Sequence, residues 1–223
     1  MTAKKLSISI VLFVMALFKI SAQQYLDPEY IKVTNERASK IVEKLELYNP
    51  EKEKTVTDII AKQYQNLSKI QDERDAKIES LKKSKLSEDK QIKEIEKIKA
   101  NADKSIAKLH KSYLRQLATH LSEDKIDVVK DGMTYGVLPK TYGAYLEMIP
   151  SLTDSQKDYI YKTLKEAREH AIDGGSSKEK HAWFGKYKGR INNYLSAEGY
   201  DLQKERDGWY KRIEEEKNKS EKQ

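Results

Sequence analysis

The sequence has 223 residues, of which 35% are charged and 38% hydrophobic, and its formal net charge is +7. This length suits one domain, or a domain with an extension. The absence of cysteine excludes disulfides, thiolate metal sites, cysteine nucleophiles and a lipoprotein anchor. Because there are only four histidines, we expect no metal centre, and we expect no bound cofactor.

The first 22 residues have the three-part layout of a secretory signal peptide. Lys4 and Lys5 precede an apolar run over 6–18, which is too short to span a bilayer comfortably, and the small residue Ala22 ends the segment. We therefore predict signal cleavage and a mature chain, 23–223, that is periplasmic or secreted and has no membrane span. The alternative is an uncleaved N-terminal anchor.

Signal removal also reduces the positive charge of the chain. Lys4, Lys5 and Lys19 are lost, which leaves 40 bases against 36 acids and a net charge of +4. The remaining bases form no polycationic block, whereas nucleic-acid binding usually needs a concentrated basic surface. We therefore expect no nucleic-acid partner. These features do not specify an oligomeric state.

Helix-start signals dominate the first half of the mature chain. Asp27–Pro28 and Asn49–Pro50 each combine a capping residue with proline at the first helical position. Apolar residues then recur at spacings of three and four. These patterns predict helices over about 28–47 and 50–83.

A third helix, predicted over 88–120, follows after only a short polar segment, 84–87. The second and third helices have similar lengths, and neither glycine nor proline interrupts them. We therefore expect 51–120 to form one long antiparallel helical hairpin, with its far end in solvent.

The character of the chain changes at Gly132, because all nine glycines lie between Gly132 and Gly208. Glycine, proline and capping residues predict an ordered loop over 133–139, followed by shorter helices. Together with the hairpin, these elements predict a single all-α domain, 23–223, a helical bundle with a compact C-terminal helical part. The glycine- and tyrosine-rich segment 132–200 is the candidate functional region. The four helices are expected over about 141–149, 153–172, 177–197 and 202–217.

The helix start at Leu152-Thr153-Asp154-Ser155-Gln156 resembles the LTxxQ motif of the periplasmic Spy-type chaperones. The same residues also match a hydrophobic staple with a capping box, in which Gln156 reaches back to the cap. Similar Leu-Ser sequences precede Glu88 and Glu123. Capping is the favoured interpretation of all three.

The predicted helix over 177–197 contains two interior glycines, Gly185 and Gly189. Together they cost about 2 kcal/mol relative to alanine, so some compensation is expected. The favoured interpretation is close packing of another helix against the glycine face. The alternative is a ligand that approaches the backbone there and bonds to His181 and Asn192.

Glu166, His170 and Asp173 are spaced so that both carboxylates can reach the imidazole on one helix. The favoured interpretation is an ion-pair cluster at a helix C-terminus, and the alternative is a general acid. A single histidine with two carboxylates does not specify a metal site. Five tyrosines crowded nearby suit either a core or a ligand platform. They are Tyr135, Tyr142, Tyr145, Tyr159 and Tyr161.

These considerations give a candidate ligand-binding set within 132–200. Catalytic roles are unknown, and three members of the set are weak catalytic candidates: His170, His181 and Arg190. The whole set is Tyr135, Tyr142, His170, His181, Trp183, Lys188, Arg190 and Asn192.

Two stretches of the chain are similar to an uncharacterised domain-of-unknown-function family. They are DGMTYGVLPKTYGAYLEMIPSLTDSQ (131–156) and KEAREHAIDGGSSKEKHAWFGKYKGRINNYLSAEGYDL (165–202). The resemblance covers nearly the whole mature chain. It implies a secreted protein of a Gram-negative bacterium, encoded near polysaccharide-utilisation genes, including pectin-related ones. It implies a glycan context but no reaction and no catalytic residues.

Three functions remain open. The favoured one is a glycan-associated binding or accessory protein in polysaccharide utilisation, with an acidic oligo- or polysaccharide as partner. The first alternative is an enzyme, a lyase or hydrolase of such a glycan, with His170 or His181 as base and Arg190 countering uronate charge. The second alternative is a periplasmic holdase chaperone. The bases expected to bind an acidic glycan are Lys178, Lys180, Lys186, Lys188 and Arg190.

Overall fold

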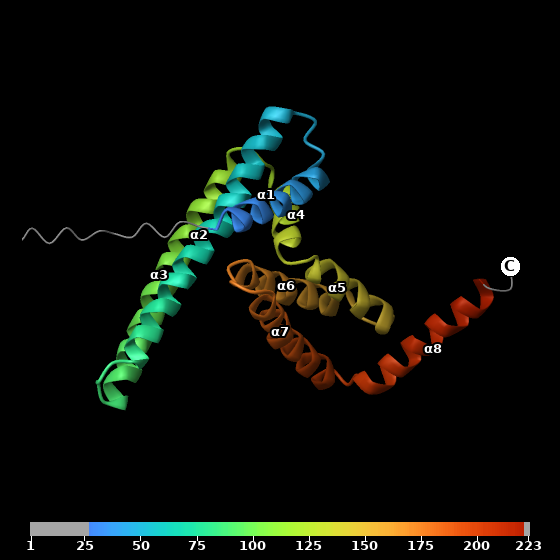
Figure 1. The fold of residues 1–223 in the computed structure, drawn as a ribbon. Coiled ribbons are helices and arrows are strands. Elements are labelled where there is room, and N and C mark those ends of the chain that lie inside the picture. Colours follow the sequence, from blue (N-terminus) through green and yellow to red (C-terminus); the bar gives the residue numbers. More distant parts are fainter. Residues whose placement is uncertain (1–26, 221–223) are drawn as a thin grey trace, which may run out of the picture.

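The computed structural model describes residues 27–220, and its helices in this range are joined by short connections without any strand (Figure 1). This confirms the prediction of an all-α helical bundle. The predicted signal peptide, 1–22, lies outside the described residues. A short 3₁₀ turn, Glu43–Leu45, extends the first helix. The helices are α1 (Pro28–Val42), α2 (Pro50–Lys82), α3 (Glu88–Ala118), α4 (Glu123–Met133), α5 (Val137–Met148), α6 (Asp154–Ala171), α7 (Ser177–Ala197) and α8 (Leu202–Ser220).

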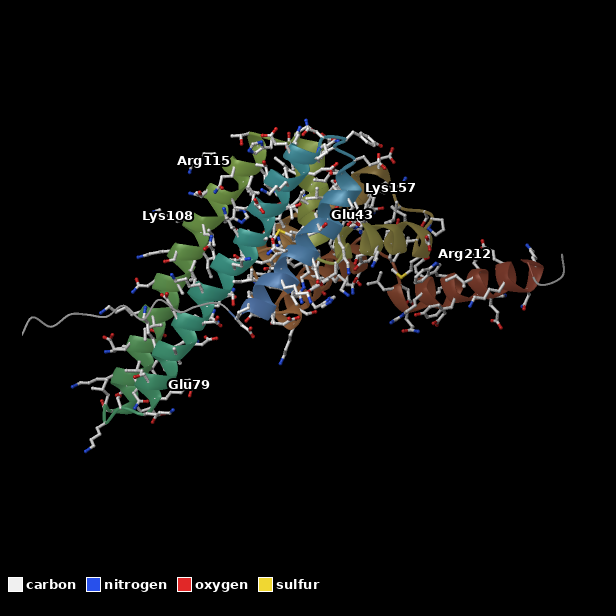
Figure 2. All side chains as sticks on the ribbon, turned by 45° about the horizontal axis from the view of Figure 1, so that its top comes forward. Glu43, Glu79, Lys108, Arg115, Lys157 and Arg212 are labelled. Carbon is white, nitrogen blue, oxygen red and sulfur yellow. The ribbon has the colours of Figure 1, made fainter. Side chains whose placement is uncertain are left out.

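Helices α2 and α3 form the expected long antiparallel hairpin, which projects from the rest of the molecule (Figure 1). At about 1.5 Å per residue, α2 is roughly 50 Å long. The last buried residue of α2 is Gln71 and the first of α3 is Ala102, so the end that carries Glu79 stands in solvent (Figure 2). Lys108 and Arg115 project outward from α3 (Figure 2).

Side-chain caps account for several of the predicted helix starts, but Ser87 and Ser122 precede α3 and α4 without a side-chain cap hydrogen bond, so the capping prediction is wrong there. The Asp27 carboxylate accepts a hydrogen bond from the Glu29 amide, and the Asn49 side chain accepts one from the Lys52 amide, both at 2.9 Å. Thr153 and Gln156 form a complete capping box. The LTxxQ residues therefore begin a helix, as expected from capping.

Two hydrophobic cores hold the helices together. The first joins α1, α2, α3 and α4, and among the described residues Ile172 is its only buried member from beyond α4. The second joins α5, α6 and α7, and Leu202 at the start of α8 packs against it. Within residues 27–220, no helix is both long and apolar enough to cross a membrane.

The ordered loop predicted over 133–139 is wrong at both ends. Helix α4 includes Met133, and α5 begins at Val137, so only 134–136 connect them. Pro139 lies in the first turn of α5, where its missing N–H would have had no helical partner. Gly136 has a φ of +65°, a left-handed conformation that glycine adopts without strain.

Candidate functional site

A groove of about 370 Å³ lies between one face each of α5, α7 and α8. We name it the basic groove. Its lining consists of Lys140, Thr141, Ala144, Tyr145, Met148, Lys188, Asn192, Leu202, Arg206 and Trp209.

Regular helical spacing places these side chains on common faces. Lys188 and Asn192 are one turn apart on α7, and Leu202, Arg206 and Trp209 follow the i, i+4, i+7 pattern of one face of α8. Helix α8 is held against the end of α5 by the guanidinium of Arg212, labelled in Figure 2. It donates hydrogen bonds to two α5 carbonyl oxygens, at 2.7 and 3.2 Å.

The charge of the groove is uniformly positive. Lys140, Lys188 and Arg206 line it, and its lining contains no aspartate or glutamate. None of the three forms an ion pair with another described residue. Lys140 donates a hydrogen bond to the Tyr135 carbonyl at 3.3 Å, and Arg206 donates one to the Gln203 side chain at 2.7 Å. The three cations therefore produce a positive field that is not neutralised locally.

Aromatic and amide groups form the neutral part of the groove. The Tyr145 hydroxyl donates a hydrogen bond to the side-chain oxygen of Asn192 at 2.6 Å. Burial raises the pKa of Tyr145 to about 12, so this phenol keeps its proton at neutral pH. With its oxygen engaged, Asn192 is left with its amide nitrogen as a donor. The half-buried indole of Trp209 adds a flat apolar surface.

Gly185 and Gly189 lie on the same face of α7 as Lys188 and Asn192. Both are exposed, and a Cβ atom built on either would meet nothing within 4 Å. The interpretation that another helix packs closely against this face is therefore wrong. The structure leaves the α7 main chain open beside the basic groove, as the alternative interpretation requires.

Only two members of the predicted ligand set, Lys188 and Asn192, lie in the basic groove. A second group, on the surface of α6 and α7, lies around the buried Tyr187 and consists of His170, Trp183 and Arg190. There His170 stacks on Trp183 with ring centroids 4.5 Å apart, and the Arg190 guanidinium lies 4.8 Å from the Tyr187 ring centroid. Arg190 also forms an ion pair with the Glu166 carboxylate at 3.4 Å.

The remaining predicted residues form separate aromatic contacts. Tyr135 stacks on His181 with ring centroids 5.8 Å apart, and Tyr142 meets Tyr161 edge-on at 5.3 Å. Tyr145 is buried in the second core, and Tyr142 and Tyr159 pack against it. The eight predicted residues thus do not share one pocket. Of the five tyrosines, Tyr142, Tyr145 and Tyr159 belong to the second core, whereas Tyr135 and Tyr161 are exposed.

The predicted cluster of acids around His170 does not form. The Glu166 carboxylate instead accepts a hydrogen bond from the Tyr187 hydroxyl at 2.7 Å. The Asp173 carboxylate lies 2.9 Å from the Nδ1 atom of His110, which sequence reasoning did not single out. Helical spacing would have allowed Glu166 and Asp173 to contact His170. Tertiary packing instead places His110 of α3 beside Asp173 at the end of α6.

Several bases expected to meet an acidic glycan are already engaged. Lys180 is buried and donates hydrogen bonds to the carbonyls of Ala171 and Ile172 at 3.3 and 3.0 Å. The ammonium of Lys186 lies 5.2 Å from the ring centroid of Trp183. Of the five bases, Lys188 lies in the groove.

Sequence reasoning missed Lys140, Arg206 and Trp209. The i, i+4, i+7 spacing of the α8 residues was a usable signal, because it places a cation and an indole on one face. Within residues 27–220, no group of three histidine, aspartate or glutamate side chains is arranged to hold a metal ion.

The fold and the groove thus define an all-α protein with a basic groove between three helices. The chain belongs to the family described as "Protein of unknown function (DUF3826)", whose model matches residues 31–215. This confirms the resemblance to a domain-of-unknown-function family, whereas the bacterial source and the glycan context remain predictions. No curated protein matches the sequence.

Proposed function

We propose that this is an exported glycan-binding or accessory protein, and that the basic groove holds an acidic oligosaccharide. One observation carries the proposal: three bases and no carboxylate surround an aromatic and apolar surface. A uronate oligosaccharide combines carboxylates with sugar rings that have apolar faces. Each feature of the groove therefore has a counterpart in such a ligand.

Each kind of groove residue would bind a different part of the ligand. Arg206 presents a planar fork of donors that matches a carboxylate, and Lys140 and Lys188 act as point charges. Trp209 offers a flat surface to a sugar ring, and the Asn192 amide nitrogen donates to a hydroxyl. The proposed ligand is thus held by charge, stacking and directional hydrogen bonds together.

The arrangement favours binding over catalysis. No histidine, aspartate or glutamate lines the groove, so imidazole and carboxylate groups for general acid–base catalysis are missing from its lining, and the Tyr145 hydroxyl is already bonded to Asn192. The weak catalytic candidates lie elsewhere: His170 and Arg190 beside Tyr187, and His181 beside Tyr135. We therefore place the enzyme alternative second.

Isothermal titration of the mature chain with oligogalacturonides tests the proposal. We expect saturable binding that weakens with added salt, and no binding of neutral cello-oligosaccharides of the same length. Arg206→Ala should weaken binding about tenfold or more, because a charged hydrogen bond contributes about 1.5–3 kcal/mol. Lys204→Ala, which removes a base from another side of α8, is the matched control and should bind like the wild type.

Two results would contradict the proposal. One is the absence of oligogalacturonide binding by the wild type. The other is normal binding by folded Arg206→Ala together with loss of binding by Arg190→Ala, which would move the site to the α6–α7 surface. Circular dichroism of each variant establishes that it is folded.

A further inference from the structure

A second, more enclosed cavity of about 240 Å³ lies between α1, α2, the α4–α5 connection and the start of α7. We infer that this cavity binds a small tetrahedral oxyanion, phosphate or sulfate, either free or as an ester on a small organic group. The inference is independent of the proposed function, because this cavity shares no lining residue with the basic groove.

The charge of the cavity points to an anion. Arg37 and Lys180 line it, and no aspartate or glutamate does. Arg37 forms no hydrogen bond or ion pair with another described residue. Lys180 is 5% exposed and uses two of its three donors on main-chain carbonyls, so one donor remains for a ligand.

Arg37 and Lys180 are close enough for their positive charges to repel one another. Burial lowers the pKa of Lys180 to about 8, and Arg37 contributes to the lowering. Asp173 and Glu179, which lie outside the cavity lining, act in the opposite direction. An anion between Arg37 and Lys180 would compensate both charges at once.

Hydroxyl groups complete the donor set. Tyr30, Tyr64 and Ser177 line the cavity, but the Tyr30 hydroxyl donates to the Tyr64 main-chain carbonyl at 3.4 Å, which leaves Tyr64 and Ser177 as donors. Burial raises the pKa of Tyr64 well above its usual range, so its phenol stays protonated. This hydroxyl has no hydrogen-bond partner among the described residues, and it is therefore available to donate to an oxyanion.

The rim of the cavity includes a strained residue. Tyr135 has a φ of +61°, a left-handed conformation that is uncommon for a bulky side chain, and its ring stacks on His181.

The volume of the cavity corresponds to about eight waters of bulk liquid. This is enough for a phosphate or sulfate group together with a small organic part.

Titration of the mature chain with inorganic phosphate and inorganic sulfate tests the inference, with sodium chloride at matched ionic strength as reference. We expect saturable binding and a rise in melting temperature with the tetrahedral anions only. Arg37→Ala and Tyr64→Phe should each weaken binding about tenfold. Neither side chain bonds to another described residue through the group removed, so both variants should fold.

Controls and a second pair of probes sharpen the result. Lys40→Ala, on α1 but outside the cavity lining, and Arg206→Ala, in the basic groove, should bind the anions normally. Tighter binding of glucose 6-phosphate or glucose 6-sulfate than of the free ions would assign the site to an ester, and equal or weaker binding to the free ion. The inference is overturned if the wild type responds to phosphate and sulfate only as it does to chloride. It is also overturned if folded Arg37→Ala and Tyr64→Phe both bind normally.

Discussion

The contact between His110 and Asp173 fixes α3 of the hairpin against the end of α6. The Nδ1 atom lies 2.9 Å from the carboxylate oxygen, but the alignment is poor for a hydrogen bond, so the contact is best described as an ion pair. This short contact raises the pKa of His110, against the opposing effect of burial. Glu169 also raises the pKa, and Lys130 lowers it.

This ion pair predicts a pH-dependent stability. The unfolded imidazole has a pKa of about 6.5, and the folded one is higher. The stabilisation is therefore fully present below about pH 6.5 and is lost as the pH rises through the folded value. Urea unfolding of His110→Gln at about pH 6 should show a loss of about 1–3 kcal/mol, because Asp173 is left unpaired.

Asp173→Asn is the matched control and should lose the same pH-dependent part of the free energy of unfolding. The double variant should lose little more than either single variant. A His110→Gln protein whose stability follows the wild-type curve at every pH would show that the ion pair contributes nothing.

At the scale of elements, the two interior glycines of α7 lower its helix stability, and close packing does not require them. Gly185→Ala and Gly189→Ala should each raise the free energy of unfolding by about 1 kcal/mol, because alanine favours helix and the new methyl group meets nothing within 4 Å. Gly175→Ala should have the opposite effect, since its Cβ would collide with the Gln71 side chain. Chemical denaturation measures all three.

A decrease or no change in stability for both α7 variants would contradict this account. Oligogalacturonide titration of the same two proteins adds a functional reading. Weaker binding by a more stable protein would mean that the open main chain of α7 contacts the ligand, as expected where function and stability compete.

Helix boundaries were predictable where a cap and its neighbours act locally. Asn49 and Thr153 form the caps that the sequence indicated. The two matched arms of the hairpin followed from the absence of glycine and proline within 51–120. Pro139 was misleading because proline is compatible with both a loop and the first turn of a helix.

The candidate site was predictable only in part. Lys188 and Asn192 were expected to bind a ligand and lie in the basic groove. Arg206 and Trp209 were missed because their role depends on how α8 packs against α5, which no local pattern specifies. For the same reason Asp173 pairs with His110 on a distant helix and not with its sequence neighbour His170.

At the scale of the whole molecule, a buried arginine joins the two cores. Arg168 on α6 is 1% exposed, and its guanidinium donates hydrogen bonds to Asp127 at 2.5 Å and Asp131 at 2.8 Å, both on α4. The neighbouring Lys130 pairs with Glu169 at 2.8 Å. The contact between the two helices is therefore largely ionic.

Arg168→Met should destabilise the protein by about 3–5 kcal/mol, because it leaves Asp131 without an ion-pair partner and Asp127 with Lys165 alone, at 3.3 Å. Guanidinium denaturation, followed by circular dichroism, measures the loss. Asp127→Asn and Asp131→Asn, introduced together with Arg168→Met, should recover part of it. A loss below about 1 kcal/mol would show that the two cores do not depend on this arginine.

The two cores also have a consequence for how the chain acquires its structure. Apart from Ile172, the buried residues of the first core all precede α5, and those of the second all follow α4. Contacts between residues close in sequence require little loop closure before they form, which favours fast folding. A chain that is synthesised from its N-terminus can therefore form the first core, which includes the hairpin, while the later helices are still unfolded. The basic groove, which needs Arg206 and Trp209, is then among the last parts of the described structure to form.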